Sequence, residues 1–408
     1  MSPPSAERYD FLAPEALREP HGFVRRLRSE DPIHWSPQFN GWVLTRYADV
    51  LAAARDRRLV SPPATGWLDR LPTHLKERFQ PARESLRLWA GLSGEQDHLD
   101  FQRALRKYFT PTQMDRLRPS VQRFTDELLH AARVSGELEV VAELARPLSA
   151  SVIGELLGLP VEDRELLLRW STDIFSFFHH AELESLQRGQ HSLLEMQDYM
   201  RPLIAERRRA PREDLVSVLV SQQEGFFARE PEAVVANCVT LLFSGHETTS
   251  QLISSGLLLL LQNPEQRALL RDDPALIPSA IEEMLRHEGA TAAMPRVSRE
   301  PLELGGRRFS AGECFILVYR AANRDPEVFA EPDRFDITRQ PNRHLGFGMG
   351  PYSCLGAALS RMEAEVCFRT LLRRMPDLRL ASETPDWKPL PPMNRALRSL
   401  RVAGMPRP

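Results

Sequence analysis

The stretch FGMGPYSCLGAALSR, residues 347–361, places one cysteine among three glycines at the start of an amphipathic helix. Gly348 and Gly350 permit backbone angles that other residues avoid, and they let a flat group approach the chain closely. Backbone N–H groups and the positive end of the helix dipole can point at a sulfur in position 354. Both effects favour the thiolate form of Cys354, which acts either as a nucleophile or as a metal ligand.

Two kinds of chemistry compete for such a thiolate. A nucleophilic cysteine needs a histidine base nearby, and His344, ten residues upstream, belongs to no signature that supports this use. An axial ligand of haem iron needs a loop relieved by glycines, a flat aromatic wall such as Phe347, and shelter from water. A small buried cysteine before a helix is the structural alternative, but it leaves the glycines and Phe347 unexplained. We therefore predict that Cys354 is a ligand of haem iron.

The composition is that of a globular protein with a large core. The 408 residues are 42% hydrophobic and 26% charged, and the net charge is −2. A nucleic-acid binder would usually be clearly basic, so this class is not expected. The four cysteines form no C-x-x-C pair, which predicts reduced thiols and a cytoplasmic location. The N-terminal segment has no apolar core of signal-peptide length.

Helical periodicity dominates the chain and predicts a mainly α fold, with residues 1–408 in a single domain because no linker divides them. The longest predicted helix, 230–262, would be about 50 Å long and must run through the middle of the protein. A charge and several hydroxyls in SGHETTSQ interrupt its apolar part, which favours a buried helix over a membrane span. Residues 31–47 predict a β-hairpin around an Asn-Gly turn. The other predicted helices cover 98–135, 138–158, 160–175, 181–209, 212–222 and 275–288, and predicted strands cover 294–300, 302–309 and 314–318.

The segment FGMGPYSCLG resembles the haem-binding signature of the cytochromes P-450, F-G-x-G-x-H-x-C-x-G. The matching positions are Phe347, Gly348, Gly350, Cys354 and Gly356. The chain departs from the signature at Tyr352, where the family usually has His or Arg in contact with a haem propionate, whereas a phenol can donate a hydrogen bond but brings no charge. The resemblance extends from about residue 8 to 403. It implies the cytochrome P-450 fold, with haem b (iron protoporphyrin IX) between the long central helix and the helix that follows the cysteine.

A second motif interrupts the long helix. FSGHETTS, residues 243–250, resembles the family motif [AG]-G-x-[DE]-T, with Ser244 where Ala is commoner. Gly245 would let the backbone lie close to a flat cofactor. Cleaving O₂ requires protons, and the resemblance implies that Glu247 and Thr248 relay them from solvent. A zinc-protease motif H-E-x-x-H is excluded because position 250 is serine.

The E-x-x-R pair of the family matches Glu283 and Arg286, which share one helix face. Arg334 occupies the P-x-R-F position of the partner segment. By resemblance, these three residues form a buried network that braces the loop under the haem. Alone, a pair three residues apart is usually a surface ion pair of little energetic value.

The haem propionates need cationic or donor partners. Arg296 and His98 match family positions for this contact. Where the family has Arg after His98 the chain has Gln102, so either Gln102 donates as a neutral group or the neighbouring Arg103 substitutes. Arg103, Arg106 and Lys107 could form the docking face for an acidic electron donor, although a solvated face is an equal alternative.

The resemblance implies a bacterial-type haem-thiolate monooxygenase, active as a monomer with ferredoxin-type electron donors. It would insert one atom of O₂ into a lipophilic steroid, terpenoid, fatty acid or polyketide by hydroxylation or epoxidation. The alternatives are a peroxygenase that uses H₂O₂ and a haem-binding or docking protein without turnover. The aromatic run from Phe175 to Phe178 could line a pocket or belong to the core. The expected substrate contacts are Leu241, Ser244, Gly245, Thr291, Met294 and Met393.

Overall fold

The computed structural model describes residues 9–66, 68, 71–92, 95–132, 137–178, 182–382, 384–388 and 396–404. The chain divides into two compact units. The first unit comprises Met1–Val60, Thr125–Ala145 and Thr248–Pro408, and the second comprises Ser61–Phe124 and Arg146–Glu247. The organisation as one domain therefore stays a prediction.

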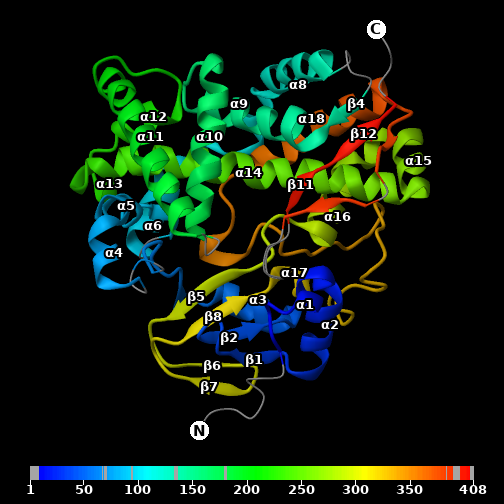
Figure 1. Cartoon of the computed structure of the whole chain (residues 1–408), viewed down its shortest axis with the longest axis horizontal. Helices are drawn as coiled ribbons and strands as arrows, with labels where there is room; N and C mark the ends of the chain where they lie inside the picture. Colours follow the sequence, from blue (N-terminus) through cyan, green and yellow to red (C-terminus); the bar gives the residue numbers. More distant parts are fainter. Residues whose placement is uncertain are drawn as a thin grey trace. The chain divides into compact units, whose positions relative to one another are not determined.

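A five-stranded sheet forms one end of the first unit (Figure 1). Its strands, in spatial order, are β1 (Ile33–Ser36), β2 (Gly41–Leu44), β8 (Cys314–Leu317), β5 (Met294–Ser298) and β3 (Leu59–Val60). The β1–β2 pair is the antiparallel hairpin that the sequence predicts, with His34 opposite Val43. Asn40 takes the left-handed backbone angle at its turn, with φ of 46°, which asparagine tolerates better than most residues. Strand β2 then pairs in parallel with β8, so the sheet joins segments far apart in the sequence.

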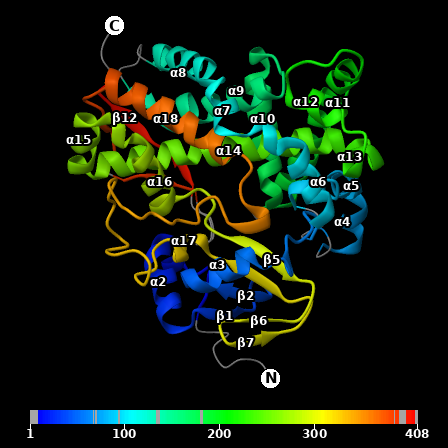
Figure 2. The same cartoon turned by 180° about the vertical axis from the view of Figure 1, so that it is seen from behind.

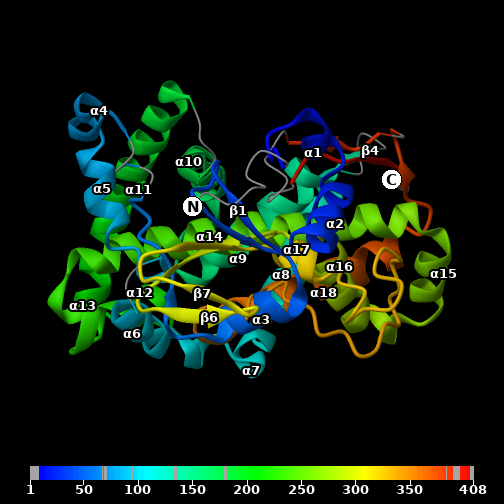
Figure 3. The same ribbon diagram turned by 90° about the horizontal axis from the view of Figure 1, so that it is seen from below.

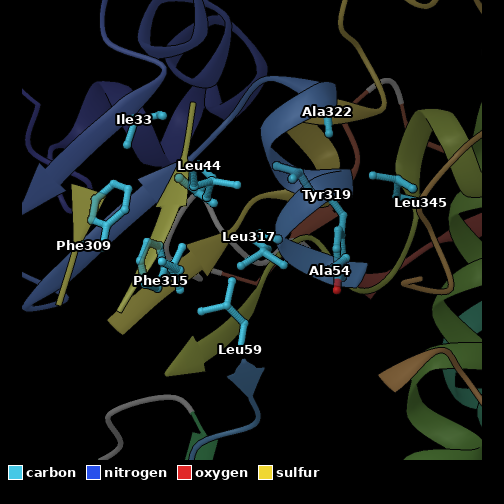
Figure 4. Close-up of a cluster of buried hydrophobic side chains, with 14 residues drawn as sticks. Ile33, Leu44, Ala54, Leu59, Phe309, Phe315, Leu317, Tyr319, Ala322 and Leu345 are labelled. Carbon is cyan, nitrogen blue, oxygen red and sulfur yellow. The ribbon is translucent and has the colours of Figure 1, made fainter. Parts of the chain in front are cut away.

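Apolar side chains from this sheet and from two helices form a buried cluster (Figure 4). Helices α3 (Tyr47–Arg55) and α17 (Tyr319–Ala322) contact each other, and a short hairpin of β6 (Leu302–Leu304) and β7 (Arg307–Phe309) lies next to α3 (Figure 3). Burial of such apolar surface contributes about 25 cal/mol per Å². The labelled members of the cluster include Ile33, Leu44, Phe315, Leu317, Tyr319 and Leu345.

The remaining elements of the first unit are mostly helical. Helix α18 (Ala357–Arg374) lies beside α16 (Ile277–Glu288) and along the part of α14 that follows residue 247 (Figures 1 and 2). The other elements are α1 (Pro14–Arg18), α2 (Pro20–Glu30), α15 (Pro264–Asp272), a sheet of β4 (Glu137–Glu139), β12 (Arg401–Ala403) and β9 (Arg379–Leu380), and the pair β10 (Asp386–Trp387) and β11 (Leu397–Ser399).

The regular elements among the described residues of the second unit are all helices. Its elements are α4 (Thr73–Arg78), α5 (Gln80–Leu86), α6 (Glu95–Leu105), α7 (Pro111–Asp115), α9 (Arg146–Leu156), α10 (Arg164–Ile174), α11 (Leu183–Arg209), α12 (Leu215–Val220) and α13 (Gly225–Arg229). Two helices belong to both units, α8 (Arg118–Ala132) and α14 (Glu232–Gln262). No helix of the described chain is both long and apolar enough to cross a membrane.

Most of the predicted helices are confirmed, and one of them continues through an internal proline, Pro202. The expected helix 230–262 is α14, and 181–209 is α11. The expected helix 98–135 is wrong as a single element. Thr110 caps a new helix by accepting a hydrogen bond from the N–H of Gln113, and Pro111 follows in its first turn, so the chain restarts there.

The start of the expected helix 138–158 is also wrong. Leu138 lies in strand β4 opposite Val402 of β12, and a π-helical stretch, Val140–Ala145, precedes α9. The partner strand lies more than 250 residues away in the sequence, so a local pattern contains no sign of it. Helical periodicity was present, but tertiary pairing overrode it.

Candidate functional site

The loop before α18 has the conformation that its glycines allow. Gly348 and Gly350 both have positive φ, 66° and 74°, a region that residues with a side chain rarely adopt. A Cβ on Gly350 would also collide with the backbone carbonyl oxygen of Ala54 in α3. The loop closes through a hydrogen bond of 2.8 Å from the Cys354 N–H to the Phe347 carbonyl. These constraints place the thiol of Cys354 immediately before the first turn of α18.

Two of the predicted influences on the sulfur are present. The N–H of Gly356 points at the Cys354 thiol, and the charge of Arg361 lies near it. Desolvation by the surrounding protein outweighs both, so the pKa of the Cys354 thiol is raised above its ordinary value. The thiolate form of Cys354 therefore stays a prediction from the loop. A metal that coordinates the thiol would remove the proton itself.

An arginine, a glutamate and a histidine fasten this loop to α16. Arg361 donates to both carboxylate oxygens of Glu282, over 2.6 and 2.8 Å. His344 Nε2 lies 3.0 Å from the same carboxylate. The Arg361 guanidinium also covers the ring of Phe347, 4.6 Å from its centroid. Sequence reasoning missed Glu282, because the neighbouring Glu283 fitted the family motif.

Because of these contacts, protonation of Glu282 at low pH should destabilise the fold. Desolvation raises its pKa, but the hydrogen bonds from Arg361 and His344 outweigh it and lower the pKa to about 2, from 4.5. A lowered pKa stabilises the fold above pH 4.5, and that contribution is lost as the pH falls from 4.5 towards 2. The Glu282 side chain is 30% exposed, and solvent screens it, so we expect a contribution of about 1–2 kcal/mol.

The measurement is urea unfolding of the parent and of Glu282→Gln between pH 3 and pH 6. The parent should lose stability more steeply than the variant below pH 4.5. Glu184→Gln is the control, because Glu184 forms an exposed pair with Arg188 in which the glutamate side chain is 80% exposed. The prediction is contradicted if the free energy of unfolding falls equally steeply with pH in the parent and in Glu282→Gln.

A buried ionic network begins at the next residue of α16, Glu283. Arg286 donates to the two carboxylate oxygens of Glu283 over 2.7 and 2.8 Å, and both side chains are fully buried. The same guanidinium donates to the backbone carbonyls of Asn323, Pro332 and Arg334 over 2.7 to 3.0 Å. Through these hydrogen bonds, α16 fixes the irregular segment that precedes the cysteine loop.

The predicted role of Arg334 in this network requires a correction. Its side chain is 57% exposed and pairs with Glu331, so it contributes only its backbone carbonyl. The second guanidinium on Glu283 belongs to Arg339, whose Nε lies 3.2 Å from both carboxylate oxygens. Motif matching selected Arg334 because it fills the P-x-R-F position. The path of the loop, which the motif does not describe, turns that side chain to solvent.

The part of α14 in the second unit carries the predicted acid. Glu247 is 7% exposed, and its carboxylate lies 3.5 Å from the Arg146 guanidinium and 3.7 Å from His246 Nε2. The burial excludes the simple explanation that Glu247 marks a solvent-facing point of the helix. Gly245 is explained by packing, because a Cβ there would lie 2.8 Å from Ile153 Cγ1 of α9.

The part of α14 in the first unit begins at Thr248. The next residue, Thr249, shares a hydrogen bond of 2.8 Å with Ser360 of α18. Two residues further on, Gln251 exchanges two hydrogen bonds with the backbone of Leu397. These buried polar contacts fix α14 against α18 and β11. The polar residues that interrupt the apolar helix therefore include structural groups as well as the predicted relay.

The two predicted propionate partners, Arg296 and His98, belong to different units of the chain. Arg296 belongs to β5 in the first unit and is 1% exposed. His98 is buried on α6 in the second unit, with Nδ1 3.3 Å from the Ala90 carbonyl. Arg103 is 71% exposed and pairs with Asp100, and the choice between Gln102 and Arg103 stays open.

The expected substrate contacts are spread over several elements. Leu241 is buried on α14, and Ser244 donates to the Thr240 carbonyl over 2.7 Å. Thr291 is half-buried before β5, and Met294 begins that strand. Met393 lies outside the described residues.

The aromatic run after α10 packs against α14. Phe175 lies 6.0 Å from Phe243, centroid to centroid, and Trp89 lies 5.6 Å from the same ring. Phe177 is buried. This part of the run therefore belongs to an aromatic cluster with α14, as the core alternative predicts.

The model of the cytochrome P450 family matches residues 167–397. The chain belongs to this family. It is 35% identical to the biotin biosynthesis cytochrome P450 of Bacillus subtilis (strain 168), over 92% of this chain and 94% of the relative. It is 38% identical to a steroid C26-monooxygenase of Mycobacterium tuberculosis, over 76% of this chain and 84% of the relative. The predicted fold and the enzyme class, a cytochrome P450 monooxygenase, are thereby confirmed.

Solved structures agree with this assignment. P450BioI in complex with an acyl carrier protein carrying hexadec-9Z-enoic acid has a TM-score of 0.88, 34% identity, and coverage of 96% of this chain and 99% of that chain. The myxobacterial cytochrome P450 CYP267B1 in complex with myristic acid has a TM-score of 0.84 and 38% identity, and covers 97% of this chain and 99% of that chain.

The first unit of this cytochrome P450 fits the haem that the family carries. A Cβ on Gly356 would meet no described atom within 4 Å, so the packing of the chain does not explain this glycine, whereas a flat cofactor would. Among the described residues no carboxylate acts on Arg296 and its buried Nε has no acceptor, and a propionate would supply the missing anion. Cys354 would ligate the iron, and Phe347 and Tyr352 would lie beside it.

Proposed function

We propose that this cytochrome P450 inserts one atom of O₂ into a lipophilic small molecule, with electrons from a ferredoxin and protons from Glu247 and Thr248. The observation that carries the proposal is the buried Glu247 carboxylate, held in the middle of α14 beside Thr248. Burying a carboxylate in so apolar a helix is costly, and the Arg146 guanidinium is the cation beside it. An acid next to an alcohol is the arrangement that proton delivery requires.

The residues of the chain have distinct parts in this reaction. When bound, the haem supplies the chemistry that cleaves O₂, assisted by electron donation from the Cys354 sulfur. Glu247 holds a proton at its carboxyl group and exchanges it with the Thr248 hydroxyl. Arg146, with 23% of its side chain exposed, lies 3.5 Å from the carboxylate and stabilises it after the proton has left.

The substrate class is inferred from relatives and from apolar residues of α14. The relatives include an enzyme named as a steroid monooxygenase and structures with hexadec-9Z-enoic acid or myristic acid. In this chain Leu241 and the aromatic cluster around Phe243 offer apolar contacts. A steroid, terpenoid, fatty acid or polyketide, free or as an acyl group on a carrier protein, is the proposed substrate.

The electron donor would dock on basic residues near the end of α6. Arg106 and Lys107 are exposed, whereas Arg103 already pairs with Asp100. An acidic ferredoxin would be attracted to such residues, and the attraction would weaken with salt. The monomeric state and the cytoplasmic location remain predictions from the sequence.

The test combines binding spectra with turnover. The reduced carbonyl adduct should show the red-shifted absorption of a thiolate ligand. Some compounds of a lipophilic panel, which includes acyl-carrier-protein conjugates, should shift the haem spectrum when they bind. At least one of these compounds should be oxidised when surrogate ferredoxin, reductase and NADPH are added. Product formed with H₂O₂ alone at a comparable rate would favour a peroxygenase. No product from any ligand that shifts the spectrum would favour a protein without turnover.

A further inference from the structure

Arg296 is a buried cation whose orientation has to be imposed by its neighbours. It is 1% exposed, and its one protein acceptor among the described residues is the Pro295 carbonyl, 2.7 Å from Nη1. No carboxylate of the described residues faces it, and the groups that influence it electrostatically are Tyr319 and Tyr352. A guanidinium has five N–H donors, so most of its donor capacity is directed at something other than the described protein.

One face of this guanidinium is covered by an aromatic ring. The Arg296 Cζ atom lies 4.6 Å from the centroid of the Tyr352 ring. Tyr352 ends the short 3₁₀ helix Gly350–Tyr352 and stands two residues before Cys354. The buried Tyr319, from the apolar cluster of Figure 4, lies near the same cation. The cysteine loop thus contacts β5 through the Tyr352 ring and the Arg296 guanidinium.

Stacking and carboxylate binding use different parts of a guanidinium. A ring attracts the flat face of the cation, whereas a carboxylate accepts hydrogen bonds from N–H groups in the plane. A ring below Arg296 therefore leaves the N–H edge available for an anion. A histidine or arginine at position 352 would bring a second cation to the same place, whereas the ring of tyrosine stabilises the cation that is there.

We propose that Tyr352 is a positioning residue that acts through Arg296: the face of its ring orients the guanidinium whose N–H edge binds a haem propionate. The phenol hydroxyl is not required for this role. The proposal rests on the haem cofactor of the family and not on the proposed substrate. It assigns to one cation and one aromatic face the function that the family signature usually gives to a charged side chain at position 352.

The test separates the ring from the hydroxyl. Tyr352→Phe keeps the ring and removes the hydroxyl, whereas Tyr352→Leu removes both. Holoprotein would be mixed with excess apomyoglobin, and the rate of haem transfer would be followed by absorbance. We expect Tyr352→Phe to release haem at a rate within about threefold of the parent rate. Tyr352→Leu should release haem about 10 to 30 times faster, because losing a desolvated cation–π contact weakens binding by about this factor.

A second readout reports on the electrostatics of the site. The reduction potential of the haem should fall in Tyr352→Leu, because a loosened guanidinium neutralises the propionate less, and it should stay near the parent value in Tyr352→Phe. Tyr9→Leu is the control, because Tyr9 is another buried tyrosine of the first unit with a hydrogen bond to Glu30. It should lower stability without changing either readout.

Two results would overturn the inference. Equally fast haem release from Tyr352→Phe and Tyr352→Leu would assign the role to the hydroxyl. Parent-like release from both variants would show that Tyr352 has no positioning role. The carbonyl spectrum and turnover of the parent report on the proposed function separately, so the failure of one conclusion can be told from the failure of the other.

Discussion

Arg339→Leu should destabilise the protein by about 3–5 kcal/mol, whereas Arg334→Leu should change its stability by less than about 0.5 kcal/mol. The Arg339 side chain is 10% exposed and contacts the fully buried Glu283 carboxylate. Its loss removes one of the two guanidiniums on Glu283 and the donor that Arg339 gives to the carbonyls of Ala330 and Glu331, whereas the Arg334 carbonyl keeps its bond from Arg286.

Arg334→Leu is the matched control because it makes the same change five residues away in the same loop. The Arg334 side chain is exposed, and the carbonyl that accepts from Arg286 and Arg339 remains after the substitution. Unfolding of the holoprotein in urea would be followed by circular dichroism and by haem absorbance. If Arg334→Leu is the more damaging variant, the motif-based assignment is right and the contact network described here is not the one that braces the loop.

Thr248→Ala should divert most of the electrons from NADPH into H₂O₂ while haem stays bound. Without the hydroxyl, the relay would not deliver protons in time, and the electrons would end in H₂O₂ and not in product. Glu247→Gln keeps the size of the side chain but cannot supply a proton, so product formation should fall by about 100-fold or more. The measurement is the ratio of product to NADPH consumed, with H₂O₂ assayed in parallel.

Thr249→Ala is the control for this pair. Its hydroxyl bonds to Ser360 of α18, so the variant should lose about 1 kcal/mol of stability and retain the coupling of the parent. A parent-like ratio of product to NADPH in Thr248→Ala would show that the relay assignment is wrong. Equal uncoupling in both threonine variants would point to a general loosening of α14 instead.

The cysteine ligand and the long helix could be predicted because their signals are local. A metal ligand in a glycine-relieved loop needs particular residue types at short offsets, and Gly348, Gly350 and Cys354 provide them within seven residues. Helix α14 follows from a continuous apolar pattern without a proline. The hairpin of β1 and β2 follows from alternation around Asn40.

Other features depended on which distant groups surround a side chain. The pKa of Cys354 is raised by desolvation, and no local pattern reports how much protein surrounds a sulfur. The ion pair of Arg361 and Glu282 joins residues that are 79 positions apart in the sequence. The strand at Leu138 exists because β12 pairs with it.

The sequence by itself determined the family and the course of the longest helix, and it predicts the iron ligand and the acid–alcohol pair, because each depends on residue types at fixed short spacing. Only the tertiary structure decided that Arg339 and not Arg334 reaches Glu283, and that the ring of Tyr352 lies against Arg296. The reason is that spacing specifies where a residue stands along the chain, whereas the direction of its side chain depends on the path of the backbone and on the groups that path brings near.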